Sequence, residues 1–140
     1  KAARGGDGRE YPWGDGWNPE NAVGMERTIY QFKTGMYPVG SSPKGVSPYG
    51  VEDMAGNVWE WVADWYGHDY YKNSPDANPK GPESGQMKVL RGGDSNYDET
   101  YHRSAKRFIN PPQVRDWVKT GFRCVIEDDS ADKNTKQDQK

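Results

Sequence analysis

Two acids, Asp53 and Glu60, are the residues whose types and spacing most clearly suggest chemistry. Glu60 lies between two tryptophans in an apolar run, and an unpaired buried carboxylate costs several kcal/mol. A Gly-Asn bend separates the two acids, so the chain could turn back and let both share one cation. The alternative is that Asp53 caps a turn and Glu60 pairs with an arginine such as Arg91 or Arg123.

The elements that must position these acids are short. Apolar residues on both faces predict a strand at 58–65 that is buried on both faces. Further strands are expected at 87–92 and 121–126, and a turn or strand at 103–108. Residues 25–36 could form a short strand or an irregular excursion.

The composition indicates one loop-rich domain whose core is built from rings. The 140 residues include six Trp, nine Tyr and three Phe but a single leucine, and Gly and Pro are abundant enough to exclude long helices. The net charge of −2 gives no reason to expect nucleic acid, and no apolar run could span a membrane. Cys124 is the only cysteine, which excludes a two-thiolate site within the chain and favours a small buried apolar residue.

Six motifs occur in an order and spacing that resemble the formylglycine-generating enzyme (sulfatase-modifying factor) family. They are Tyr-Pro-Trp-Gly (11–14), Pro-Val-Gly (38–40), Tyr-Gly-Val-Glu-Asp-Met-Ala-Gly-Asn-Val-Trp-Glu-Trp (49–61), Asn-Pro-Lys-Gly-Pro (78–82), Val-Leu-Arg-Gly-Gly (89–93) and Gly-Phe-Arg-Cys (121–124). The resemblance implies an α+β, loop-rich variant of the C-type lectin fold with small antiparallel sheets.

The resemblance also implies a division of the chain. Residues 1–126 correspond to the C-terminal portion of the family domain, and residues 1–4 resemble the last turn of a helix that closes the preceding half. The resemblance implies that this preceding half is missing, so that either a separate N-terminal chain completes the fold or the missing half was cut or never built. Residues 127–140 are polar, lack aromatic residues and are expected to form a disordered tail.

The family resemblance further implies a structural calcium site around the segment from Asp53 to Glu60. The ligands carried over are the side chains of Asp53 and Glu60 and the carbonyls of Gly56 and Val58. Calcium accepts such mixed oxygen ligands and tolerates irregular geometry. A second family site would fall at Asn21 and Ala22, although its acid is replaced by Gln31. Calcium would favour an extracytoplasmic location.

The family enzyme oxidises a substrate cysteine to formylglycine with copper held by two cysteine thiolates. The matching positions in this sequence are Tyr97 and His102, and neither can act as a thiolate. Copper chemistry by this chain is therefore not expected, and His102 is interpreted as a polar surface histidine. The family pattern Gly-Gly-Ser-Trp also changes to Gly-Gly-Asp-Ser at 92–95, which again argues for altered or lost chemistry.

The segment that follows could instead form a binding surface, because it is rich in the aromatic and arginine side chains that dominate binding hot spots. The candidate residues are Tyr97, Tyr101, His102, Arg103, Arg107, Arg115 and Trp117. The alternative is that half of them are core residues and that the arginines pair with Asp94, Asp98 and Asp116. A protein, peptide or sugar could be the ligand.

Together these observations predict a non-catalytic, calcium-stabilised binding or structural domain, that is, a pseudoenzyme of the family. The alternative is an oxidoreductase that converts a sulfatase cysteine to formylglycine and whose catalytic groups are completed by another chain.

Overall fold

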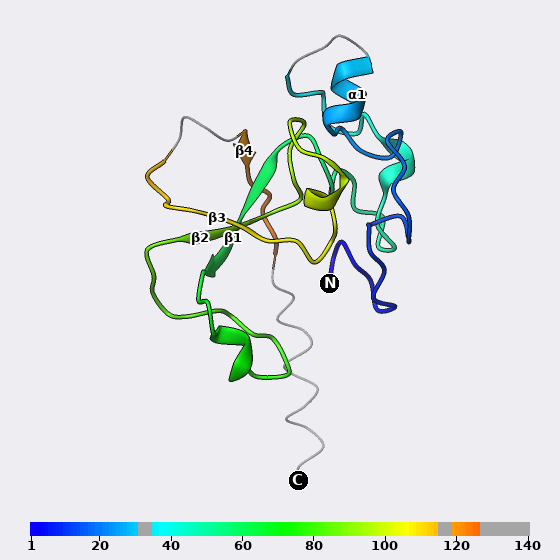
Figure 1. The fold of residues 1–140 in the computed structure, drawn as a ribbon. Helices are drawn as coiled ribbons and strands as arrows, with labels where there is room; N and C mark the ends of the chain where they lie inside the picture. Colours follow the sequence, from blue (N-terminus) through cyan, green and yellow to red (C-terminus); the bar gives the residue numbers. More distant parts are fainter. Residues whose placement is uncertain (31–34, 115–118, 127–140) are drawn as a thin grey trace.

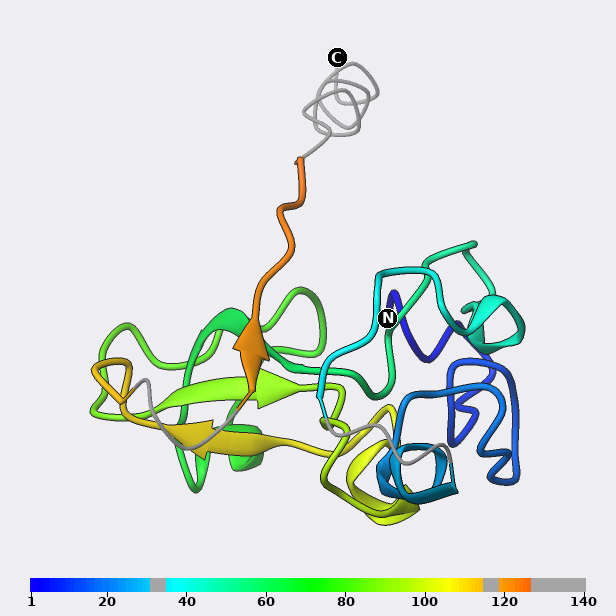
Figure 2. The same cartoon turned by 90° about the horizontal axis from the view of Figure 1, so that it is seen from above.

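A four-stranded sheet in the order β3-β2-β1-β4 lies at one side of the molecule, and the loops of the first 50 residues gather at the other side (Figure 1). Figure 2 shows the same separation from above. The computed structural model describes residues 1–30, 35–114 and 119–126. The strands are β1 (Trp59–Trp65), β2 (Lys88–Arg91), β3 (Phe108–Asn110) and β4 (Thr120–Gly121). The small sheet and the long loops confirm the expected loop-rich fold class.

Two of the three strand pairings are antiparallel, as expected. β1 pairs with β2, with Glu60 opposite Arg91 and Trp61 opposite Leu90, and β2 pairs with β3. The short β4 instead runs parallel to β1, which makes the sheet mixed.

β2 is the best buried strand because it is covered by neighbours on both edges and by side chains on both faces. Successive residues of a strand point to opposite faces, and both Val89 and Leu90 are buried. The strand predicted at 58–65 forms as β1, but it is fully buried only at Trp59 and half-buried along most of its remaining length. The expectation that both of its faces are buried is therefore wrong.

Helical structure is limited to short pieces. The helix α1 (Met25–Tyr30) replaces the strand or irregular excursion expected there, and Gly24 accepts the Thr28 N–H at 3.2 Å in its first turn. Six residues are too few to show apolar periodicity, so the pattern could not reveal this helix. Three 3₁₀ helices in the described chain span Pro43–Gly45, Tyr70–Lys72 and Glu99–Tyr101.

Aromatic rings build the core, as the composition indicates. One cluster contains Tyr11, Trp13 and Trp17, and the other contains Trp59, Tyr97, Tyr101 and Phe108. Trp59 is fully buried, with its ring stacked 5.1 Å from Phe108 and edge-on to Tyr97 at 5.8 Å. Such geometries add to the large apolar area that each ring buries.

The Gly-Asn bend joins the sheet to the loop-rich half. The Asn57 N–H donates to the Val23 carbonyl at 2.8 Å, and the Asn57 side chain bonds both backbone groups of Tyr37. Gly56 has a φ of +84°, and a Cβ there would lie 2.7 Å from the Val23 oxygen. Only glycine permits both this backbone conformation and this close approach.

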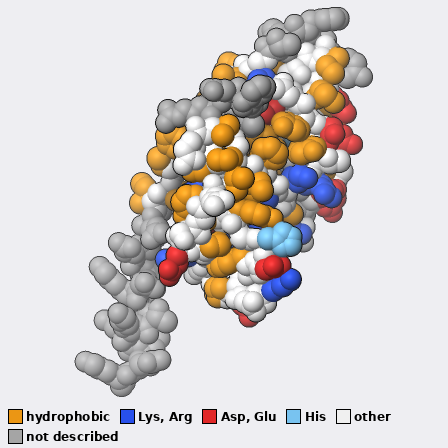
Figure 3. Space-filling model, turned by 60° about the vertical axis from the view of Figure 1, so that its left-hand side comes forward, with side chains coloured by type: hydrophobic (Ala, Val, Ile, Leu, Met, Phe, Trp, Pro, Cys, Tyr) orange, Lys and Arg blue, Asp and Glu red, His pale blue; other side chains and the backbone are white. Residues whose placement is uncertain are grey.

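The ends of the described chain hold little regular structure. Residues 1–4 form a turn closed by an α-helical type of hydrogen bond, from the Gly5 N–H to the Lys1 carbonyl at 2.9 Å, and Gly5 has a φ of +70°. Of the strand expected at 121–126, only Gly121 belongs to β4. The predicted tail at 127–140 lies outside the described residues. Within the described ranges no helix is long and apolar enough to cross a membrane. Figure 3 shows apolar side chains gathered over the middle of one face.

Candidate functional site

The four residues carried over as calcium ligands line one hollow of about 570 Å³ beside β1 and β4. They are Asp53, Gly56, Val58 and Glu60. We call this space the Glu60 hollow. The turn at the Gly-Asn bend brings the first two back beside β1, so all four residues face one space.

Arg123, directly after β4, supplies the cation that Glu60 needs. Its Nε donates to the Glu60 carboxylate at 2.7 Å, and its second amino group completes a bidentate pair. The same guanidinium donates to the carbonyls of Glu52 at 3.1 Å and Asp53 at 3.2 Å. The hydrogen bonds to Glu60 raise the pKa of Arg123. The structure therefore contains the arginine pairing that the sequence left open as an alternative.

The oxygens of the Glu60 hollow suit calcium in kind, but several already have partners. An Asp53 carboxylate oxygen accepts the Gly40 N–H at 2.7 Å, and the Gly56 carbonyl accepts the Val58 N–H at 2.9 Å. Among the described residues, no three His, Cys, Asp or Glu side chains form a metal-binding group. Both Glu60 oxygens accept from Arg123, so a calcium ion at Glu60 would share the carboxylate with the guanidinium or displace it.

The second position carried over for calcium has an unusual feature. The Asn21 side-chain oxygen is buried and has no hydrogen-bond partner among the described residues, and Ala22 beside it is fully buried. An unpaired buried oxygen is costly, so this atom suits a cation or a water molecule. Gln31, which replaces the expected acid, lies outside the described residues.

Tyr97 and Tyr101, predicted to lie on a binding surface, are half-buried in the ring cluster around Trp59. Their ring centroids are 4.6 Å apart, and both rings pack edge-on against Trp59. Burial raises the pKa of the Tyr97 hydroxyl. Each of the two tyrosines therefore contributes to ring packing and also keeps part of its surface exposed.

His102 is fully buried, so its interpretation as a surface histidine is wrong. Its Nδ1 lies 2.7 Å from the Asp98 carbonyl, which holds that nitrogen protonated in the neutral ring. Its Nε2 is enclosed without a hydrogen-bond partner in the described chain, and the ring lies 5.1 Å from the Trp17 ring. Burial lowers the pKa of His102, and burial also raises the pKa of nearby Asp94.

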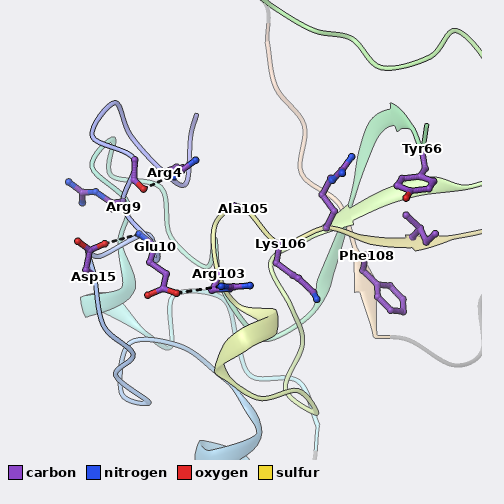
Figure 4. A pocket seen from close by; sticks show the side chains of 12 residues that line it. Arg4, Arg9, Glu10, Asp15, Tyr66, Arg103, Ala105, Lys106 and Phe108 are labelled. Carbon is purple, nitrogen blue, oxygen red and sulfur yellow. Dashed lines mark hydrogen bonds and ion pairs between the residues drawn. The ribbon is translucent and has the colours of Figure 1, made fainter. Parts of the chain in front are cut away.

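Arg103 and Arg107 line a second space, a pocket of about 680 Å³ at the outer edge of β3, which we call the arginine pocket (Figure 4). Figure 4 shows Arg4, Arg9 and Glu10 on the N-terminal side of this pocket and Phe108 on the sheet side. Arg103 lies 3.8 Å from Glu10, and among the described residues it forms no ion pair with Asp94 or Asp98, while Asp116 lies outside them.

Three further cations of the arginine pocket, Arg4, Arg9 and Lys106, escaped the sequence reasoning. Two of them come from a Gly-rich turn about a hundred residues before Lys106, and no local pattern connects these segments. Arg115 and Trp117, the remaining candidates for the binding surface, lie outside the described residues.

Cys124 is exposed, so the expectation of a buried apolar residue is also wrong. β4 ends at Gly121, and the chain beyond it leaves the sheet, which exposes Phe122 and Val125 as well. The thiol is therefore a surface group beside Arg123 and takes no part in either cavity.

Comparison with known proteins gives a consistent result. Residues 1–128 match the sulfatase-modifying factor enzyme 1-like domain. The chain is 36% identical to the formylglycine-generating enzyme of Thermomonospora curvata, over 90% of this chain and 46% of the relative. PvdO from Pseudomonas aeruginosa superposes with a TM-score of 0.68 at 30% identity, over 86% of this chain and 46% of the other. Treponema denticola variable protein 1 superposes with a TM-score of 0.65 at 27% identity, over 86% of this chain and 42% of the other.

The chain spans about half the length of these relatives. The family match covers residues 1–128, a range that contains the sheet and the Gly-Asn bend. The chain belongs to the formylglycine-generating enzyme, or sulfatase-modifying factor, family.

Proposed function

We propose that this chain is a non-catalytic, calcium-stabilised binding domain of its family. The observation that carries the proposal is the state of the two positions that match the family's copper-binding cysteines. Tyr97 packs into the ring cluster around Trp59, and His102 is enclosed beneath the surface. The single thiol of the chain, Cys124, is exposed outside both cavities. This arrangement provides no thiolate pair for Cu(I).

The experiment that tests this proposal is an assay for formylglycine formation. The purified chain is incubated with Cu(I), oxygen and a cysteine peptide of the sulfatase type, and the peptide is examined by mass spectrometry for conversion of its thiol to an aldehyde. We expect no conversion by the wild type or by the Cys124→Ser variant. Conversion that requires a second polypeptide would instead support the alternative, an oxidoreductase completed by another chain.

Calcium is the second part of the proposal, and the gathering of four oxygen-bearing residues around the Glu60 hollow supports it. Calcium and the Arg123 guanidinium would then compete for the Glu60 carboxylate. Ligands that bind only the folded state raise its stability by mass action. We expect added chelator to lower the melting temperature of the wild type and to leave that of Glu60→Ala unchanged. Equal shifts in both proteins would contradict calcium binding at Glu60.

The arginine pocket is the part of the molecule that we assign to ligand recognition. It contains the two arginines expected on a binding surface, and it is open and lined by both apolar and charged side chains, as binding sites usually are. The large exposed side chains Met36, Val39, Phe122, Val125 and Ile126 support a further contact, with a polypeptide segment that completes the domain. Native mass spectrometry would detect a separate companion chain.

A further inference from the structure

The arginine pocket carries more positive charge than its own acids can balance. Five cationic and two acidic side chains line it, and Arg9 pairs with Asp7 outside the lining at 2.6 Å, which leaves a surplus of two positive charges. Both acids are engaged within the protein, because Glu10 faces Arg103 at 3.8 Å and Asp15 accepts the Glu10 N–H at 2.9 Å. Among the described residues, no carboxylate pairs with Arg4, Lys106 or Arg107.

Aromatic rings hold two of these cations in place. The Arg107 guanidinium lies 4.5 Å from the centre of the Tyr71 ring and 5.6 Å from that of Tyr66, and the Lys106 ammonium lies 4.4 Å from that of Tyr101. Such contacts order long side chains before a ligand arrives, which reduces the entropy lost on binding. A guanidinium stacked on a ring still presents its N–H groups at its edge, where a carboxylate can accept two of them.

The sheet side of the pocket is the unpaired edge of β3. β3 is the last strand of the sheet, and the consecutive residues 105–109 all line the pocket. In an antiparallel strand the N–H and C=O groups point alternately toward the neighbour and away from it. Within the described ranges, no backbone hydrogen bond joins residues 108–110 to anything except β2. The outward groups of this edge are therefore available to another strand.

From these two features we propose that the arginine pocket binds an acidic segment of a partner protein in an extended conformation, as a further strand beside β3. The backbone of the segment pairs with the open edge of β3, and its carboxylates meet Arg4, Lys106 and Arg107. Addition of a strand to an open sheet edge is a common form of peptide recognition. This inference rests on the proposed binding function and names its ligand class.

Fluorescence anisotropy of the full chain with labelled peptides tests the inference. The probe is a seven-residue peptide of alternating Glu and Val, compared with its Lys-Val counterpart and with a Glu-Val peptide whose outward amides are N-methylated. We expect the Glu-Val peptide to bind at least about tenfold more tightly than either control, since each control loses charge or backbone pairing. Equal binding of the Lys-Val peptide, or no binding of any peptide, would overturn the inference. Equal binding of the N-methylated peptide would overturn strand addition.

Two charge reversals probe opposite walls of the pocket. Arg107→Glu and Arg4→Glu should each weaken binding of the Glu-Val peptide about tenfold or more, whereas Lys80→Glu, an equal charge change on an exposed loop outside the pocket, should weaken it less than about twofold. Thermal melts establish whether each variant is folded. If one of the two pocket variants does not fold, the variant on the opposite wall still tests the site. Equal losses of peptide binding in all three variants would show that only the net charge of the protein matters, and would contradict binding at the arginine pocket.

The outcome of the peptide-binding experiments is independent of the tests of the proposed function. The formylglycine assay and the chelator melts decide catalysis and calcium binding without any peptide ligand. If the chain is inactive in the formylglycine assay and binds no acidic peptide, the inference of acidic-peptide binding fails while the non-catalytic function remains supported.

Discussion

The Glu60 hollow and the arginine pocket lie at opposite edges of one sheet, and they differ in whether their arginines have partners within the protein. In the hollow, Arg123 meets Glu60 and two backbone carbonyls, so its donors are satisfied inside the protein. In the pocket, Arg4 and Arg107 have no carboxylate partner in the described part of the chain. Charge that is paired internally supports the fold, whereas ordered but unpaired charge is available for a ligand.

The two regions also differ in their backbone. The Glu60 hollow adjoins the junction at which Gly56 and Val23 form a bridge between the sheet and the loop-rich half. The arginine pocket lies between a turn of the N-terminal segment and the outermost strand. A change near the hollow should therefore affect the whole fold, and a change near the pocket should remain local.

The largest difference is expected between two glycine substitutions. Gly56 and Gly8 both have positive φ, at +84° and +80°, but a Cβ at Gly56 would lie 2.7 Å from a backbone oxygen, while one at Gly8 meets only the flexible end of Arg4 at 3.5 Å. We expect Gly56→Ala to lower the free energy of unfolding by about 3 kcal/mol or more, and Gly8→Ala by about 1 kcal/mol. Urea denaturation measures both, and equal losses would show that the two regions are equally deformable.

A smaller difference is expected between two arginine substitutions. Arg123→Ala leaves Glu60 half-buried without its partner, which should cost about 2 kcal/mol of unfolding free energy. Arg107→Ala removes only ring contacts at the surface and should cost about 0.5 kcal/mol. Denaturation at one pH and salt concentration compares them directly. A larger loss for Arg107→Ala would mean that the pocket, and not the hollow, supports the fold.

The sequence predicted the hollow better than the pocket, for a physical reason. The candidate ligands of the Glu60 hollow are concentrated in one motif, where a turn must bring Asp53 back beside Glu60. Arg123 is one of two arginines named as possible partners of Glu60. The arginine pocket needs Arg4 and Arg103 to meet across about a hundred residues, and only tertiary packing determines that approach. Motifs report local geometry, but surfaces assembled from distant segments leave no periodic signal.

His102 and Cys124 show the same limit at single residues. Residue type alone favours an exposed histidine and a buried cysteine, and the structure reverses both. His102 is enclosed because the distant Trp17 and Gly24 pack against its ring, and Cys124 is exposed because β4 ends three residues before it. Burial of a single residue thus depends on contacts that the neighbouring sequence does not specify.

The smallest of the predicted effects concerns protonation of His102, which directly precedes Arg103 of the arginine pocket. Burial lowers the pKa of His102 in the folded state, so the unfolded state binds this proton more readily. Stability should therefore fall as the pH drops below the ordinary histidine value of 6.5, and the loss should be measurable between pH 7 and pH 5. Burial raises the pKa of nearby Asp94, which acts with the opposite sign.

A pair of variants isolates the histidine contribution. His102→Asn keeps a donor near the position of Nδ1 for the Asp98 carbonyl but cannot be protonated, so its stability should lose this dependence on pH while the effect of Asp94 remains. His68→Asn changes an exposed histidine beside Asp69 and should retain the dependence of the wild type. Urea denaturation at several pH values distinguishes them. If His102→Asn responds to acid as the wild type does, then His102 does not cause the acid dependence, and burial of its ring does not penalise the protonated form as expected.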